Sequence, residues 1–305
     1  MRGGRIALSP PRRLLTDLSH LSRGFPRATL LTRINVAALA EPRDQARIPW
    51  PVVFAKAYAL VAAGSPPLRR VYVKLPWPHL YELPHSVASI IVERDWPHDG
   101  DRDEKALFLG RLKAPDTATL PNLTTRMLAL KSAPIDSIAD FRRALAIARL
   151  PLPLRLLLVW LSLNIGRQVP NFMGSFAISA LGSHGAAIVG TIPVWSSFLN
   201  YGPIAPDGGV DVYLSVDHRV IDGGLAARSI RALEAALNGP VLDELRALAT
   251  QSPHCHSAPP CSATTRSPSR QGSDRQTSSW SYAPLAVTED SDTAIRSTRR
   301  TPGGR

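Results

Sequence analysis

The stretch from Val210 to Leu237 constrains the fold of this chain more than any other. Valine and leucine alternate with other residues up to Asp217, which is the period-two pattern of a strand with one buried face. Gly223 and Gly224 then interrupt the pattern, and apolar residues recur at helical spacing from Leu225 onward. The sequence therefore predicts a strand, a short loop and a helix in this order.

A histidine and an aspartate occupy the predicted loop. His218 directly follows the strand, and Asp222 lies four residues beyond it. An imidazole can take a proton from a thiol or a hydroxyl when a neighbouring group fixes its orientation. A lone histidine indicates nothing, because most of the eight histidines of this chain are expected at the surface or in loops. The position of His218 at a strand end makes it a candidate general base.

The segment from Asp217 to Gly223 reads Asp-His-Arg-Val-Ile-Asp-Gly. It resembles the signature Asp-His-Arg-Val-x-Asp-Gly of the acyltransferases that include chloramphenicol acetyltransferase and the catalytic domain of dihydrolipoamide acyltransferases of 2-oxoacid dehydrogenase complexes. A second segment, from Gly174 to Gly182, looks like the family segment that ends Ile-Ser-x-Leu-Gly. The resemblance implies that Ser179 donates its hydroxyl to the oxyanion of a tetrahedral intermediate. Taken alone, Ser179 would be an ordinary serine at a strand end.

The resemblance also implies which residues support the histidine. A carboxylate at the position of Asp222 helps to hold the histidine loop in this family, in one branch through an arginine near the first helix. Arg12 or Arg13 corresponds to that arginine, although either one could be a plain surface residue. Gly223 is expected to permit the turn, and Arg219 is expected to be a structural member of the site. No cofactor-binding residues are identified, and no metal site is predicted.

The rest of the pattern predicts an α/β fold with a mixed sheet in a two-layer arrangement similar to chloramphenicol acetyltransferase. Helices are expected over residues 12–21, 37–47, 52–63, 120–131 and 138–148. Strands are expected over residues 28–36, 70–75, 86–93, 106–112 and 195–201, with turns between the second and the third. The order resembles the whole catalytic domain of the family, from about Arg12 to Leu248.

Composition divides the chain into three parts. An N-terminal extension covers residues 1–11, and a domain like the acyltransferase catalytic domain covers residues 12–250. Residues 251–305 are rich in Ser, Thr, Arg and Pro with few large aliphatic residues, so we expect a disordered tail. Both cysteines, Cys255 and Cys261, fall in this tail with His254 and His256, at a spacing that fits no zinc pattern. Without cysteines for a disulfide framework, the folded part is expected in the cytoplasm.

The formal net charge is +12, of which the tail carries +3 through seven arginines and four acidic residues. The basic residues are dispersed and no aromatic-interleaved basic motif occurs, so nucleic-acid binding is not predicted. The apolar run over residues 150–165 contains Pro151, Pro153 and Arg155 and is shorter than the roughly 20 residues that span a bilayer. We expect a helix in the core or in a subunit contact, and no membrane span.

The resemblance implies direct transfer of an acyl group from a thioester, foremost acyl-coenzyme A, to a thiol or a hydroxyl acceptor. The family places its active site between subunits of a trimer, so a homotrimer or an assembly of trimers is expected. A lipoyl-bearing protein is the corresponding partner. No lysine stands in a lipoyl-type hairpin, so no lipoyl group is expected on this chain.

Two departures leave an alternative open. The chain begins almost directly with the catalytic part, and Gly190 to Trp195 replaces the Asn-rich segment that usually follows the serine strand. A catalytically idle structural or interaction subunit of an acyltransferase or dehydrogenase assembly would also fit these features. The retention of both His218 and Ser179 favours the enzyme.

Overall fold

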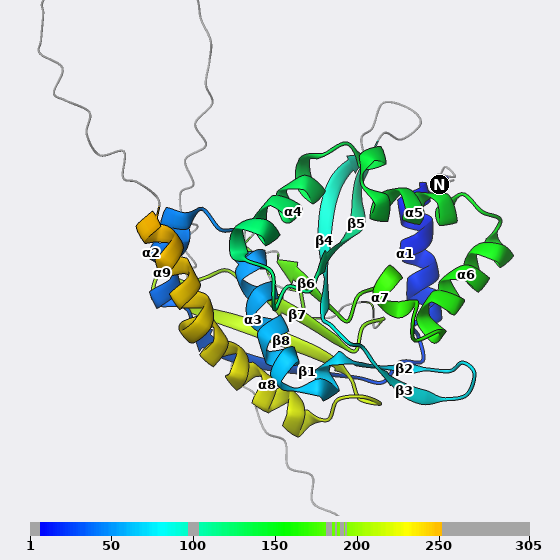
Figure 1. The fold of residues 1–305 in the computed structure, drawn as a ribbon. Coiled ribbons are helices and arrows are strands. Elements are labelled where there is room, and N and C mark those ends of the chain that lie inside the picture. The colour runs from blue at the N-terminus through cyan, green and yellow to red at the C-terminus, as the bar shows by residue number, and fades with distance from the viewer. Residues whose placement is uncertain are drawn as a thin grey trace, which may run out of the picture. The chain divides into compact units, whose positions relative to one another are not determined.

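The computed structural model describes residues 7–96, 104–180, 185–186, 188–189, 192 and 194–251. Their principal element is a six-stranded sheet with the strand order β1-β8-β7-β6-β4-β5 (Figure 1). These strands are β1 (Arg27–Asn35), β4 (Val87–Trp96), β5 (Glu104–Lys113), β6 (Phe176–Ala180), β7 (Ser197–Tyr201) and β8 (Gly209–Asp217). A separate hairpin consists of β2 (Arg70–Val73) and β3 (His79–Glu82).

The strand directions and registers define two faces of the sheet. β6 runs parallel to β4 and β7, whereas β8 runs antiparallel to β7 and β1. Successive side chains of a strand point to opposite faces. One face, here called the packed face, carries Ile178, Leu199 and Leu214 at one register level. The opposite face, here called the site face, carries Ser179, Asn200 and Tyr213 at the next level.

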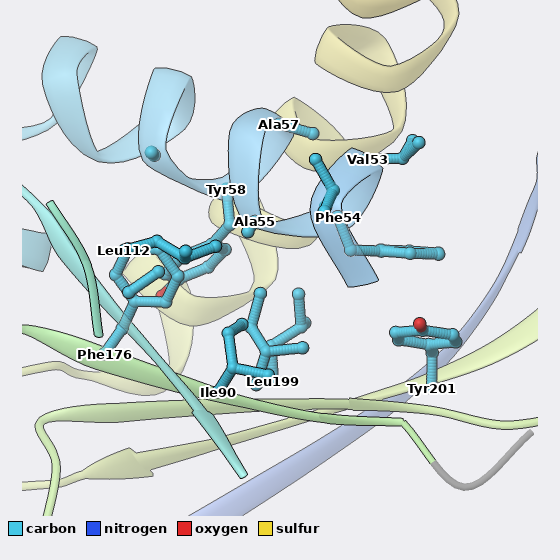
Figure 2. Packing of buried hydrophobic residues seen from close by; sticks show 14 of the residues in the cluster. Val53, Phe54, Ala55, Ala57, Tyr58, Ile90, Leu112, Phe176, Leu199 and Tyr201 are labelled. Atoms are coloured by element: carbon cyan, nitrogen blue, oxygen red, sulfur yellow. The ribbon is translucent and has the colours of Figure 1, made fainter. Parts of the chain in front are cut away.

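Helices cover the packed face. They are α3 (Trp50–Gly64), α4 (Leu120–Ser132) and α8 (Gly223–Ala236), joined by α2 (Ala37–Ala46) and α9 (Leu242–Gln251), which pack on each other. α3 is apolar around most of its circumference, so it is buried between the sheet and its neighbouring helices. Phe54 stacks on Tyr201 with ring centroids 4.0 Å apart, and Tyr58 meets Phe176 edge-on at 4.7 Å (Figure 2). Burial raises the pKa of the Tyr58 and Tyr201 phenols, which stay neutral in this core.

A smaller set of helices lies against the site face at the end of the sheet formed by β4 and β5. The set comprises α1 (Pro10–Leu21), α5 (Ala139–Ala148), α6 (Leu152–Asn164) and α7 (Val169–Phe172). Ser9 caps α1 by accepting the Arg12 N–H at 3.4 Å. A buried ion pair between Arg155 and Asp17 joins α6 to α1. A second apolar cluster, which includes Val159, Trp195 and Phe198, packs between these helices and the sheet.

The predicted α/β mixed-sheet fold is confirmed, and the predicted helices and strands each have a counterpart. The strand β3 was missed, because Pro76, Trp77, Pro78 and Pro84 around it indicate turns. The run over residues 150–165 forms α6, which is only half buried, since Leu152, Leu154 and Leu157 are exposed. No helix in the described part of the chain is both long and apolar enough to span a membrane. The predicted tail lies outside the described residues apart from Gln251.

Candidate active site

The start of β6 places Ser179. Gly174 has a φ of +75°, and a Cβ atom there would lie 2.6 Å from the Val87 carbonyl oxygen, so this position requires glycine. Ser175 then anchors the chain to β4, since its N–H donates to the Val87 carbonyl at 2.8 Å and its hydroxyl accepts the Val87 N–H at 2.9 Å. Ser179 follows near the carboxyl end of β6, on the site face, and is 8% exposed.

The surroundings of Ser179 combine an apolar cavity with a buried amide. Ser179 lines a cavity of about 1330 Å³ that extends over the site face of β4 and β5 beneath α1. On the other side, its register partner is Asn200 of β7, which is 1% exposed. No hydrogen-bond partner contacts either polar side-chain atom of Asn200 in the part of the chain that the structure describes. The Ser179 hydroxyl therefore borders the cavity, and the buried Asn200 amide lies beside it on the neighbouring strand.

Backbone hydrogen bonds hold the His218 loop. The Asp217 N–H donates to the Ser196 carbonyl at 2.9 Å, and the His218 N–H donates to the Pro26 carbonyl at 3.0 Å. The Ile221 N–H donates back to the Asp217 carbonyl at 3.0 Å and closes the turn. The backbone of His218 is thus tied to the segment before β1, while its imidazole is exposed.

Arg219 fixes this loop from the other side. Its guanidinium makes a two-pronged ion pair with Asp217, with Nη2 2.6 Å from Oδ2 and Nε 2.9 Å from Oδ1. The guanidinium carbon also lies 4.3 Å from the ring centre of Phe25 and 4.4 Å from that of Tyr72. Two aromatic rings and one carboxylate from three parts of the chain therefore immobilise Arg219. Burial lowers the pKa of the nearby Arg27, an effect that Asp217 opposes.

Asp222 acts on the helix that follows the loop. It is the N-cap of α8, where its Oδ1 accepts the Leu225 N–H at 2.6 Å. Because the extended backbone of Asp222 makes the turn, Gly223 already lies in the helix, and a Cβ atom on it would meet nothing within 4 Å. Gly223 therefore begins the helix in this structure, and its expected role in permitting the turn stays a prediction.

The two candidate arginines of the first helix lie elsewhere. Arg12 pairs with Glu104 at 2.5 Å, and the Arg13 Nε donates to the Leu8 carbonyl at 3.0 Å. Within the described residues, neither of them bonds to Asp222, whose carboxylate caps its own helix. The described residues of one copy therefore do not show the predicted arginine link to the histidine loop. Arg219, from the loop itself, holds the loop instead.

One copy of the chain does not bring Ser179 and His218 together. Each lies near the carboxyl end of its strand, but β6 and β8 run in opposite directions. Ser179 is level with Tyr213, two strands away, which is about 10 Å across the sheet. His218 lies five residues beyond Tyr213, or about 16 Å along the strand direction. These two side chains cannot meet the same reacting atoms within a single copy.

The sequence matches no protein-family model and no curated protein. Solved structures nevertheless share its fold. A probable dihydrolipoamide acetyltransferase from Listeria monocytogenes superposes with a TM-score of 0.55 and 17% identity over 77% of this chain and 94% of that chain. The chain has the fold of a dihydrolipoamide acetyltransferase. The resemblance seen in the sequence is matched by the fold over 77% of this chain.

Two further structures support the acyltransferase fold. The Azotobacter vinelandii dihydrolipoamide acetyltransferase has a TM-score of 0.55 and 16% identity over 81% of this chain and 94% of its own. A truncated catalytic core of the Thermoplasma acidophilum 2-oxoacid dehydrogenase complex has a TM-score of 0.53 and 18% identity over 78% and 99%. The likeness covers nearly the whole of those chains, so the described sheet and helices together make up this acyltransferase fold.

Sequence reasoning missed Asn200. The signal was present, because the strand reads Ser-Phe-Leu-Asn-Tyr and places a polar amide in a run whose five residues are all buried. A polar residue in a buried strand needs a partner. Only the register of β7 against β6 shows that Asn200 lies beside Ser179, where a bound group could supply the missing partner.

Proposed function

We propose that the protein is an acyltransferase that moves an acyl group from a coenzyme A or lipoyl thioester to a thiol or a hydroxyl acceptor. The observation that carries the proposal is the pairing of the Asp217 to Gly223 signature, at a strand end and helix start, with the fold of dihydrolipoamide acetyltransferases. The Azotobacter protein was studied for the role of a serine, a histidine and an asparagine in its catalytic mechanism. Its histidine and asparagine are four residues apart, as are His218 and Asp222 here.

The chemistry assigns one task to each side chain. The imidazole of His218 takes the proton from the acceptor thiol or hydroxyl, and the resulting anion attacks the thioester carbonyl carbon. The carbonyl electron pair moves onto oxygen, where the Ser179 hydroxyl donates a hydrogen bond to the oxyanion. Collapse of this intermediate breaks the carbon–sulfur bond, and the leaving thiolate takes the proton back from the imidazolium. No acyl-enzyme forms, so no nucleophilic side chain is needed.

The separation of Ser179 from His218 supports a site between two copies. The carboxyl end of β6 in one copy would face the His218 loop of the next, as expected for a closed ring such as a trimer. The Thermoplasma relative is a core of a multienzyme complex, and a similar assembly with a lipoyl-bearing partner would suit this chain. Arg219 and Asp222 then hold the histidine loop in place for the neighbouring subunit.

A thiol-release assay tests the proposal. Purified protein is incubated with acyl-coenzyme A and dihydrolipoamide, and free coenzyme A is measured beside the His218→Ala and His85→Ala variants. His85 is an exposed histidine outside the signature and serves as the matched control. We expect release by the wild type and by His85→Ala, and its loss in His218→Ala. Release that survives His218→Ala rejects the mechanism, and binding of partners without any turnover supports an idle subunit.

A further inference from the structure

The cavity beside Ser179 is larger than an acetyl group requires. Its volume of about 1330 Å³ exceeds the roughly 300–1,000 Å³ of common ligand pockets. Ile90 of β4 pairs with Ile178 of the parallel strand β6, so the next residue, Ile91, is level with Ser179. Ile91 in turn pairs with Leu109 of β5. Ile91 and Leu109 are therefore the next side chains beside Ser179 on the site face, and both line the cavity.

The cavity has apolar walls, and side chains of the described residues do not fill its volume. α1 contributes Leu14 and Leu18 to one wall. β4, β5 and α7 contribute the opposite wall with Ile91, Leu107, Leu109 and Phe172. These side chains are half-buried or exposed in the single chain, and Leu107 is 47% exposed. Leaving this much apolar surface unpacked in one volume is a feature of a ligand site.

Charged groups among the lining residues are mostly basic. Arg23, Lys131 and Arg143 line the cavity without a carboxylate partner among the described residues, while Arg111 pairs with Asp140. Glu93 is the one other acidic residue among the described lining. An apolar interior with an excess of cations suits a molecule with an apolar tail and an anionic carrier.

We propose that this cavity takes the chain of a medium- or long-chain acyl thioester whose carrier is anionic. This inference rests on the proposed function and names its substrate class. The carbonyl carbon bears both the oxygen that Ser179 would bind and the acyl chain, so a chain leaving Ser179 enters the space over Ile91 and Leu109. A short acyl group would leave most of this volume empty.

The test compares acyl donors from acetyl- to dodecanoyl-coenzyme A with one fixed acceptor, at concentrations below micelle formation. Each methylene that enters the cavity should raise kcat/KM by about fourfold until the chain fills the space. Leu18→Trp, which fills the cavity from α1, should reduce the dodecanoyl to acetyl ratio by at least about tenfold. Leu128→Trp, on an exposed position of α4 that does not line the cavity, should leave this ratio unchanged.

Binding of dodecanoate, measured by calorimetry, separates the two proposals. Binding that Leu18→Trp weakens, without turnover of any donor, keeps the cavity assignment and rejects the enzyme. Turnover of acetyl-coenzyme A with no gain from longer chains and no dodecanoate binding rejects the cavity assignment and keeps the enzyme. A rate that rises with acceptor length instead of acyl length also rejects it.

A second inference comes from Asn200. Neighbouring side chains on paired strands lie about 5 Å apart, so the Asn200 amide and the Ser179 hydroxyl can reach one common atom. Asn200 is 1% exposed, and neither polar atom of its amide has a partner among the residues that the structure describes. Such a buried amide destabilises the fold, and an apolar residue of the same size would remove this cost. We infer that Asn200 binds a polar oxygen of the substrate, donating from Nδ2 beside Ser179.

The variant Asn200→Leu gives opposite results for a binding and a structural role. A substrate-binding amide predicts a higher Tm and a kcat/KM that falls by about tenfold or more. Ser197→Ala, a buried residue on the packed face of the same strand, should leave kcat/KM unchanged. A Tm that falls in Asn200→Leu, or an unchanged kcat/KM, rejects the inference. Because this Tm is measured without substrate, the stability arm is informative even if no acyl transfer is found.

Discussion

The same strands give the two faces of the sheet different roles. On the packed face, rows such as Ile178, Leu199 and Leu214 are fully buried under α3 and α8. On the site face, the next row places Ser179 in the lining of an apolar cavity with Asn200 beside it, and Tyr213 is only half-buried. The packed face therefore supplies the stability of the fold, whereas the site face holds polar groups that a stable core does not need.

The strand β8 shows how one sequence serves both faces. Its valines and its leucine, at alternate positions, enter the packed face, and the residues between them are polar or aromatic. Asp217, at its end, extends this polar series into the His218 loop and pairs with Arg219. A substitution should thus affect activity or stability according to the face it occupies.

The largest expected effect is on activity at the site. His218→Ala should lower kcat by about 10²–10⁴-fold, because the general base is lost. Its Tm should stay near that of the wild type, because the imidazole is exposed. Steady-state kinetics and thermal unfolding of the same preparation check both parts. A large loss of Tm would mean that His218 belongs to the structure rather than to the chemistry.

A substitution on the packed face should have the largest effect on stability. Phe54 is fully buried and stacks on Tyr201, so Phe54→Ala should cost about 3–5 kcal/mol in the free energy of unfolding. Leu31→Ala, on the site face of β1 where Leu31 is 59% exposed, should change it by less than about 0.5 kcal/mol. Urea unfolding curves measure both. Equal effects would contradict the division between the faces.

A substitution of Arg219 should affect both stability and activity. Arg219→Lys keeps the charge but loses the two-pronged pair with Asp217 and the stacking on Phe25 and Tyr72, so we expect a loss of about 1–2 kcal/mol in stability. The looser loop should also lower kcat. Arg228→Lys, at an exposed position of α8, is the matched control. If both variants behave alike, Arg219 does not position His218.

The smallest expected effect is on the pH dependence of stability, at a turn far from the site. The Gly209 N–H donates to the Asp207 carboxylate at 2.9 Å and, with a smaller contribution from Arg33, lowers the pKa of Asp207 below its ordinary value. A lowered carboxyl pKa adds stability above the unfolded pKa of about 3.9, and this is lost as pH falls through the folded value. Asp207→Asn should flatten the stability curve slightly below pH 5 in acid unfolding. A steeper curve in the variant would contradict the expectation that the Asp207 carboxylate stabilises the fold.

Local pattern was sufficient to predict the elements that carry the histidine. The alternation in β8, the glycines after Asp222 and the helical spacing after Leu225 are all encoded by neighbours in the sequence. The arginine link could not be predicted in the same way. Arg12 lies near Glu104 and Arg219 lies near Phe25 and Tyr72 only because distant segments pack together.

The arrangement of residues on the site face could not be predicted from the local sequence pattern alone. Alternation shows that Ser179 and Asn200 each leave the packed face, but only the parallel pairing of β6 with β7 places them at one level. The strand order likewise decides that His218 and Ser179 lie at opposite ends of the sheet. Such pairings depend on long-range contacts, which a single sequence does not encode locally.

The central claim is that Ser179 of one copy and His218 of another form one acyl-transfer site. It is tested most directly by co-expressing Ser179→Ala and His218→Ala chains and measuring coenzyme A release by the mixed assembly. Each variant alone should be almost inactive, and random mixing should restore about a quarter of the wild-type activity, since one neighbouring pair in four regains both residues. A mixture as inactive as the separate variants would contradict the account.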